Sequence, residues 1–154
     1  MVKLVIFDFD QTLFNETLNK DVPKIINLLQ QNNIKMSIAS YNPYVMWFCK
    51  RYDIDKYFDF IYGYRSFSKI SHVNKIKMDY LEKNIYFSNK DILFIDDDAK
   101  NVHDISMLRG IESIKVPKSG IAFSCLSSIL PRYENSCLLS DPFISLCQPL
   151  SCVI

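Results

Sequence analysis

The feature that most constrains this chain is a hydrophobic run near its start that ends in two acidic residues. Residues 3–12 read Lys-Leu-Val-Ile-Phe-Asp-Phe-Asp-Gln-Thr, and their apolar part is continuous rather than alternating. Such a run of β-branched and aromatic residues is typical of a central parallel strand covered on both faces. Asp8 and Asp10 would then follow a buried strand, where an unpaired carboxylate is costly. They indicate a metal ion, a cationic partner or a reaction; two solvated acids at a strand end are the simpler alternative.

Short hydrophobic runs alternate with helical patterns along the rest of the chain. Four further strands are predicted at residues 34–39, 60–64, 91–95 and 113–116. Between them, apolar residues recur at helical spacing, with Asp21 and Asn42 as predicted helix caps and Lys69 in a predicted loop. Strands that alternate with helices favour an α/β fold with a doubly wound parallel sheet.

The composition fits one globular domain. The chain has 154 residues, 49% of them hydrophobic, and 18 basic against 17 acidic residues leave a net charge of +1. This balance gives no basic patch for nucleic acid and no acidic run typical of disorder. No apolar stretch is long enough for a membrane span, and because a predicted strand stands at the start of the sequence, we expect no signal peptide. The five cysteines are odd in number and form no Cys-x-x-Cys motif, so we expect reduced thiols in a cytoplasmic protein.

Six polar residues share one place in this predicted fold, at or just beyond the carboxyl ends of strands. They are Asp8, Asp10, Ser40, Lys69, Asp96 and Asp97. Parallel strands place these ends along one crevice, where ligands bind. Clustered carboxylates suit Mg²⁺, while a lysine and a hydroxyl suit a phosphoryl group. One carboxylate can attack phosphorus, and a second one two residues further along the chain can act as general acid and base.

In chain order, these residues resemble the four motifs of the haloacid dehalogenase (HAD) superfamily. The resemblance is carried by Asp8-Phe9-Asp10-Gln11-Thr12, by Ser40 after a strand, by Lys69, and by Asp96-Asp97 with Asn101. Residues 68–72 and 94–101 look most like the magnesium-dependent phosphatase branch. The resemblance spans residues 3–130 and implies a Rossmann-like core. Each interval between motifs holds about one helix and one strand, which predicts no cap domain or a minimal one.

The resemblance also implies a role for each of these residues. Asp8 would be the nucleophile of a Mg²⁺-dependent phosphatase, and Asp10 the general acid and base that also binds the metal through its backbone. Ser40 and Lys69 would bind phosphate. Asp96 and Asp97 would complete the Mg²⁺ site, with either one as the direct ligand. The implied substrates are protein phosphotyrosine, as part of a phosphorylated protein, or a small phosphomonoester such as a sugar phosphate.

Some features depart from the branch or leave alternatives open. Tyr41 follows Ser40 where the branch has an arginine, so a cationic contact to substrate is expected to be missing. Lys75 and Lys77 are rivals of Lys69. A receiver-like signalling module uses similar groups, but its motifs come in a different order. A catalytically inactive module that binds phosphate and Mg²⁺ is a further alternative.

The resemblance ends at residue 130, so we expect a folded domain over residues 1–130 and a C-terminal extension over residues 131–154. The extension carries only three charged residues, Arg132, Glu134 and Asp141. We expect it to pack on the same domain or to form a subunit contact, which would make the protein an oligomer.

Overall fold

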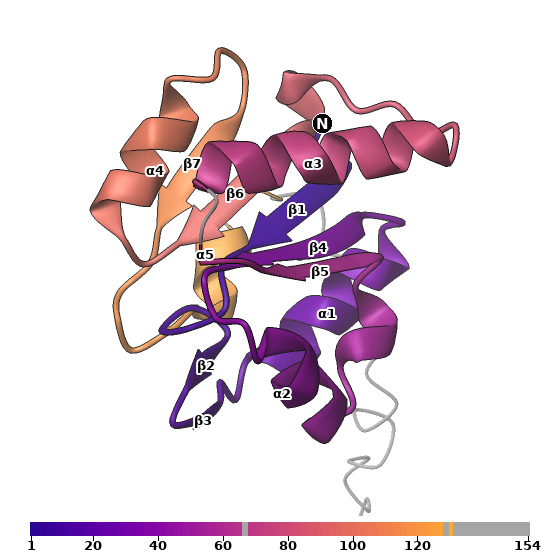
Figure 1. The fold of residues 1–154 in the computed structure, drawn as a ribbon. Helices are drawn as coiled ribbons and strands as arrows, with labels where there is room; N and C mark the ends of the chain where they lie inside the picture. The colour runs from indigo at the N-terminus through magenta and orange to yellow at the C-terminus, as the bar shows by residue number, and fades with distance from the viewer. Residues whose placement is uncertain (66–67, 128–129, 131–154) are drawn as a thin grey trace, which may run out of the picture.

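Five parallel strands form a single sheet in the computed structural model, which describes residues 1–65, 68–127 and 130 (Figure 1). The strands are β1 (Leu4–Phe7), β4 (Lys35–Ser40), β5 (Phe60–Gly63), β6 (Ile92–Asp96) and β7 (Glu112–Lys115). Their order is β5-β4-β1-β6-β7. Because the chain leaves β1 first toward one edge and later toward the other, the sheet is doubly wound. This confirms the predicted fold class, and the four later strands lie within about one residue of their predicted ranges.

Helices cover both faces of the sheet. They are α1 (Val22–Gln31), α2 (Val45–Arg51), α3 (Lys69–Glu82), α4 (Ala99–Ser106) and α5 (Phe123–Ser127), with short 3₁₀ turns at Asp55–Tyr57 and Asn89–Asp91. One face packs against α1, α2 and α5, and the other packs against α3 and α4. Among the described residues, no helix combines the length and the apolar character needed to cross a bilayer.

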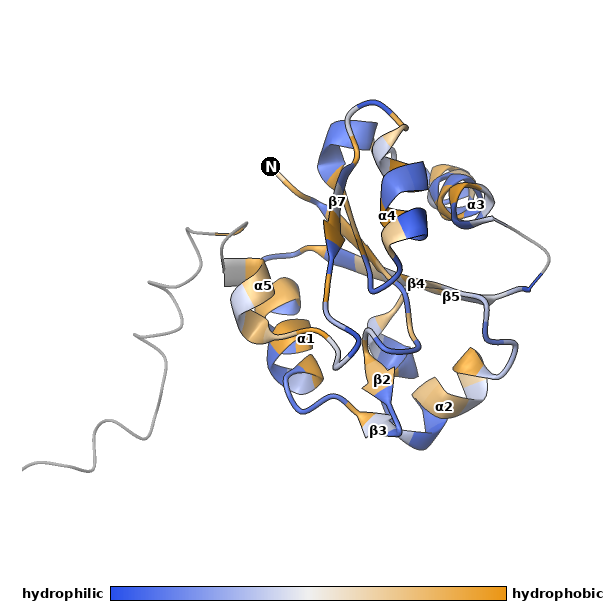
Figure 2. Cartoon of the chain, turned by 90° about the vertical axis from the view of Figure 1, so that its left-hand side faces the viewer, coloured by the Kyte–Doolittle hydropathy of each residue, from blue (hydrophilic) through white to orange (hydrophobic). Residues whose placement is uncertain are grey.

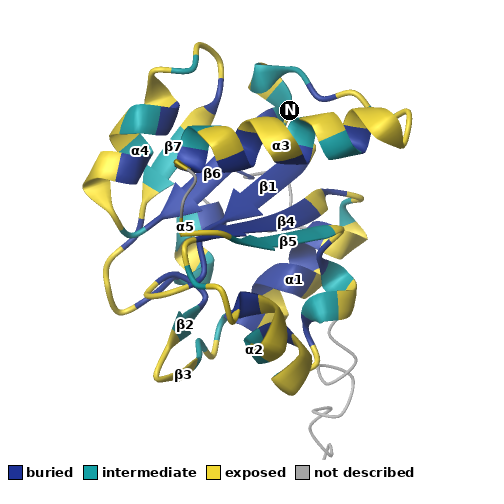
Figure 3. Ribbon diagram, in the orientation of Figure 1, coloured by how far each residue is buried: buried dark blue, intermediate teal, exposed yellow. Residues whose placement is uncertain are grey.

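The central strand contributes to two hydrophobic cores. Val5 and Phe7 of β1 pack on the face of α1, whereas Leu4 and Ile6 pack on the face of α3. Burial on both faces requires apolar residues at consecutive positions, which explains the continuous run in the sequence. Figure 3 shows β1, β4 and β6 buried while the edge strands β5 and β7 are partly exposed. Figure 2 shows the hydrophobic residues concentrated along the strands and the helix faces that cover them.

A small hairpin follows β1 at the carboxyl edge of the sheet. Its strands are β2 (Phe14–Asn15) and β3 (Thr17–Leu18), which pair antiparallel. Phe14 of the hairpin stacks on Phe9, with ring centroids 5.4 Å apart. Within the described residues, no larger insertion covers this edge, as the intervals between motifs predicted. The expected placement of residues 131–154 lies outside the described residues.

Three local predictions at helix starts were wrong. Asp21 stands at the N-cap of α1 but makes no capping bond, because its carboxylate accepts the backbone N–H of Phe123 at 2.9 Å. Helix α2 begins three residues after Asn42. Lys69 is the first residue of α3 rather than part of a loop, and the side chain of Ser68 caps that helix by accepting the N–H of Ser71.

Gly63 is required where β5 meets the loop that follows β4. A Cβ at this position would lie 2.1 Å from the Asn42 carbonyl oxygen and 2.7 Å from Cγ1 of Val45. We therefore expect Gly63→Ala to lower the free energy of unfolding by about 1–3 kcal/mol, because the backbone must move to relieve the overlap. Urea denaturation would measure this, with the exposed Glu82→Ala as control. Equal stability of Gly63→Ala and the unmodified protein would contradict the prediction.

Candidate active site at the carboxyl edge of the sheet

A pocket of about 550 Å³ opens at the carboxyl ends of the strands. It is lined by residues from the ends of β1, β4, β6 and β7: Asp8, Asp10, Gln11, Tyr41, Asp96, Asp97, Asp98, Ala99, Asn101, Lys115 and Lys118. Four of the six predicted site residues are among them. The other two, Ser40 and Lys69, are almost completely buried. The topology of a parallel sheet therefore brings the predicted residues together, as expected for a binding crevice.

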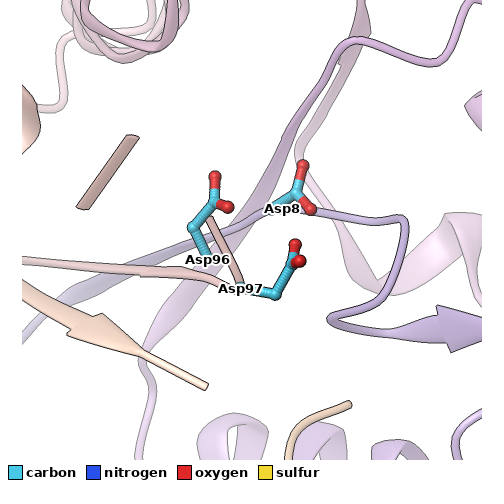
Figure 4. Close-up of side chains that lie close together, drawn as sticks. All are labelled: Asp8, Asp96 and Asp97. Atoms are coloured by element: carbon cyan, nitrogen blue, oxygen red, sulfur yellow. The ribbon is translucent and has the colours of Figure 1, made fainter. Parts of the chain in front are cut away.

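Three carboxylates gather in this pocket. The register of β1 with β6 pairs Phe7 with Ile95, so Asp8 and Asp96 follow side by side. Oxygens of Asp8, Asp96 and Asp97 lie within 4.8 Å of one another, and Figure 4 shows the three side chains converging. Asp8 and Asp96 are buried, whereas Asp97 is half-buried. The group offers hard oxygen ligands at a spacing that one divalent cation can bridge.

Burial disfavours the charged forms of these three acids. Burial raises the pKa of Asp8 to about 7, with Lys69 opposing this effect and Asp96 adding to it. Burial is also the main cause that raises the pKa values of Asp96 and Asp97. A carboxylate whose pKa is raised in this way favours either a proton or additional positive charge. The acids therefore fit a metal ion such as Mg²⁺.

Lys69 supplies the positive charge within the buried group. Its ammonium lies 2.5 Å from Oδ1 of Asp8 and 3.5 Å from Oδ2 of Asp96, and it also donates to the carbonyl of Ala39. The lysine is 2% exposed. The two rival lysines are engaged elsewhere: Lys75 pairs with Asp79, and Lys77 donates to the side chain of Asn89. Of the three lysines, only Lys69 lies among the strand-end carboxylates.

Ser40 ends β4 and directly precedes Tyr41, which lines the pocket. Its hydroxyl oxygen accepts the backbone N–H of Asn42 at 3.0 Å, which leaves the hydroxyl proton free to donate. The amide of Asn42 in turn donates to Oδ1 of Asp10 at 3.2 Å. Through these bonds, the loop after β4 holds the exposed carboxylate of Asp10 at the mouth of the pocket.

Two further residues connect the loops around the pocket. The amide of Asn101 donates to Oδ2 of Asp96 at 3.0 Å, and its oxygen accepts the hydroxyl of Tyr41 at 3.4 Å. The ring of Tyr41 lies 4.7 Å from the ammonium of Lys69. Tyr41 therefore adds an aromatic contact to the lysine at the position where a cationic side chain was expected to be missing.

Sequence reasoning missed Lys115 and Lys118, which also line the pocket. Lys115 ends β7, and its backbone pairs with that of Asp96 in the neighbouring strand. The rule that identified the acids, namely a polar residue at the carboxyl end of a strand, also applies to Lys115. Lys118 lies beyond the strand, in a loop whose course the sequence pattern does not predict.

Several solved structures share this fold. A HAD-superfamily hydrolase from Ehrlichia chaffeensis has a TM-score of 0.63 and 15% identity, over 87% of this chain and 98% of its own. A β-phosphoglucomutase from Clostridium difficile has a TM-score of 0.61 and 11% identity, over 90% of this chain and 100% of its own. The N-terminal part of a Bacteroides fragilis protein, which contains a phosphatase domain and is complexed with Mg, has a TM-score of 0.57 and 12% identity, over 77% of this chain and 37% of its own.

The comparisons with solved structures establish the fold of this protein. No protein-family model matches the sequence, and no curated protein matches it either. The structural likeness nevertheless covers 77–90% of the chain. The chain has the Rossmann-like α/β fold of the HAD-superfamily hydrolases, as the motif resemblance predicted.

Proposed function

We propose that this protein is a Mg²⁺-dependent phosphomonoester hydrolase that works through an aspartyl phosphate on Asp8. The observation that carries this proposal is the placement of Asp8. Its carboxylate is held by the buried Lys69 beside Asp96 and Asp97, at the mouth of an open pocket. The fold is that of HAD-superfamily hydrolases, which supports the same chemistry.

The residues present fit a magnesium ion. Asp8, Asp96 and Asp97 would hold it through carboxylate oxygens, and Asp10 through its backbone carbonyl, as the resemblance implies. When bound, the ion supplies charge neutralisation and polarisation for the transferring phosphoryl group. Mg²⁺ binds few carboxylates and retains several waters, which suits a half-open site of this kind.

The side chains of the chain itself account for the two steps of the proposed reaction. In the first, an oxygen of Asp8 forms a bond to phosphorus while the ester bond breaks and the leaving oxygen takes a proton from Asp10. In the second, Asp10 takes a proton from water, the water oxygen attacks phosphorus, and inorganic phosphate leaves Asp8. Lys69 and Ser40 stabilise the phosphoryl oxygens through positive charge and a donated hydrogen bond.

The substrate belongs to this proposal as well. The pocket is open at the edge of the sheet, and the only described element added there is the β2–β3 hairpin. Such a site admits either a phosphotyrosine on a protein surface or a small phosphomonoester such as a sugar phosphate. A cytoplasmic location is also part of the proposal, because the five cysteines are odd in number and form no Cys-x-x-Cys motif.

The experiment that tests this function is hydrolysis of p-nitrophenyl phosphate by the purified protein, with Mg²⁺ and with excess EDTA. We expect turnover with Mg²⁺ and its loss with EDTA. A stable phosphoprotein without turnover would instead indicate the receiver-like alternative. Binding of Mg²⁺ without either reaction would indicate an inactive module.

Mg²⁺ is also expected to stabilise the folded protein. A ligand that binds only the folded state at 100 times its Kd adds about 2.7 kcal/mol, which corresponds to roughly 5–10 °C in Tm for a chain of this size. Asp8 has a pKa of about 7 in the folded protein against 3.8 when unfolded, so the metal-free fold loses stability as pH rises through that interval.

The Mg²⁺-induced increase in Tm should therefore be larger at pH 8 than at pH 5, where the ion must displace a proton from Asp8. Thermal melts with Mg²⁺ and with EDTA at the two pH values would measure this. Identical melts at saturating Mg²⁺ would show that the three acids form no metal site.

A further inference from the structure

Two lysines that line the pocket have no part in the reaction described above. Lys115 and Lys118 are both exposed, and within the described residues neither ammonium forms an ion pair. Lys69, by contrast, is buried and held by Asp8, Asp96 and Ala39. The pocket therefore contains two positive charges outside any ion pair of the described residues, although the charge of Lys118 also acts on Asp97 and opposes the rise in its pKa.

The segment that carries these lysines is tied to the strands that carry the acids. The N–H of Val116 donates to the carbonyl of Asp96, and the N–H of Ile121 donates to the carbonyl of Thr12, both at 2.9 Å. The side chain of Asn15 also donates to the carbonyl of Lys118 at 3.3 Å. These bonds connect the segment that carries Lys115 and Lys118 to the end of β6 and to the chain that follows β1. The backbone position of this segment is therefore defined before any ligand binds.

Gly120 allows this close approach. Its φ is +103°, and a Cβ would lie 2.4 Å from Nδ2 of Asn19 and 3.1 Å from the carbonyl oxygen of Thr12. Only glycine readily adopts this φ and also lacks the Cβ for which there is no space here. The loop after β7 is therefore built to lie against the hairpin region, with its lysines at the pocket.

The size of the pocket leaves room for more than a phosphoryl group. Its volume of about 550 Å³ compares with about 30 Å³ for one water in the liquid. The phosphoryl group must bind at Asp8, so the rest of the pocket is left to the alcohol part of the substrate. Lys115 and Lys118 line this pocket, and their positive charges favour a leaving group that carries negative charge.

We propose that Lys115 and Lys118 form a second anion subsite, and that the substrate is a phosphomonoester whose leaving group carries another anionic group, a carboxylate or a second phosphate. This inference rests on the proposed phosphatase function and narrows its substrate class. The competing explanation is that both lysines only offset the negative charge of the acids. That explanation predicts that replacing the two lysines changes the binding of all phosphomonoesters equally. A subsite predicts that the replacement weakens mainly those phosphomonoesters that carry a second anion.

The test uses pairs of phosphomonoesters that differ by one carboxylate, as inhibitors of p-nitrophenyl phosphate hydrolysis. The pairs are 3-phosphoglycerate with glycerol 3-phosphate, and 6-phosphogluconate with sorbitol 6-phosphate. In each pair a carboxylate replaces a hydroxymethyl group, and the two pairs differ in the spacing of the anions. We expect the acid of at least one pair to bind about tenfold more tightly than its alcohol, since hydrogen bonds to charged groups are the stronger ones.

This preference is expressed as the inhibition constant of the alcohol divided by that of the acid. The variant Lys115→Gln/Lys118→Gln should reduce this ratio to one or below. The control Lys20→Gln/Lys50→Gln removes the same two charges from exposed positions outside the pocket and should keep the ratio. A ratio of one or less for both pairs in the unmodified protein, or a ratio unchanged in the Lys115→Gln/Lys118→Gln variant, would overturn the subsite alone. Absence of p-nitrophenyl phosphate hydrolysis would overturn the proposed function, and this inference with it.

Discussion

Replacing Asp8 with asparagine is expected to abolish both the phosphoenzyme and turnover. The amide cannot attack phosphorus, and no other described carboxylate shares the position of Asp8 beside Lys69 at the end of β1. Asp10→Asn should fail differently, because its proposed metal contact is a backbone carbonyl that survives the change. With p-nitrophenolate, protonation of the leaving group is hardly needed, so phosphorylation should proceed while hydrolysis of the aspartyl phosphate slows by roughly 10²–10⁴-fold.

Rapid-quench mass spectrometry for an added phosphoryl group separates the two variants. Asp10→Asn should accumulate phosphoenzyme, and Asp8→Asn should show none. Asp98→Asn is the matched control, because Asp98 lines the same pocket but caps α4, and asparagine is an equally good cap. A phosphorylated Asp8→Asn protein, or one with nearly unchanged turnover, would show that Asp8 is not the nucleophile.

The second large effect is expected from Lys69→Met. Methionine has a similar length but no charge, so the carboxylates of Asp8 and Asp96 would remain buried without their cation. Removing one partner of a buried ion pair costs about 3–5 kcal/mol. Phosphatase activity should be lost as well, because Lys69 is the proposed phosphate ligand. The exposed Lys75→Met on the same helix should change stability by less than about 1 kcal/mol.

The pH dependence of this variant has a defined sign. An acid whose folded-state pKa lies above its unfolded value of 3.8 destabilises the fold as pH rises through that interval. Without Lys69, the pKa of Asp8 rises further, so the loss of stability should be greater at pH 8 than at pH 5. Urea denaturation in EDTA at both pH values would measure it. Equal stability of Lys69→Met and the unmodified protein at pH 8 would argue against the buried ion pair.

The sequence by itself was sufficient to predict the architecture. It also predicted that most of the candidate site residues lie together at one edge of the sheet. A continuous apolar run defines β1 because a strand buried on both faces has no polar position. Parallel strands have a common direction, so residues that follow different strands must meet at one edge. That rule placed Asp8, Asp10, Ser40, Asp96 and Asp97 together before any contact was known.

Only the tertiary structure decided which groups contact one another. Asp21 binds the backbone of Phe123 instead of capping its own helix, and Lys69 lies 61 positions from Asp8 yet forms an ion pair with it. Bonds of this kind depend on how distant segments pack, and hydrophobic periodicity, which reports only local structure, cannot reveal them. For the same reason, the sequence pattern could not place Lys118 at the pocket, because its position depends on the loop after β7, which is bound to Thr12 and Asn15.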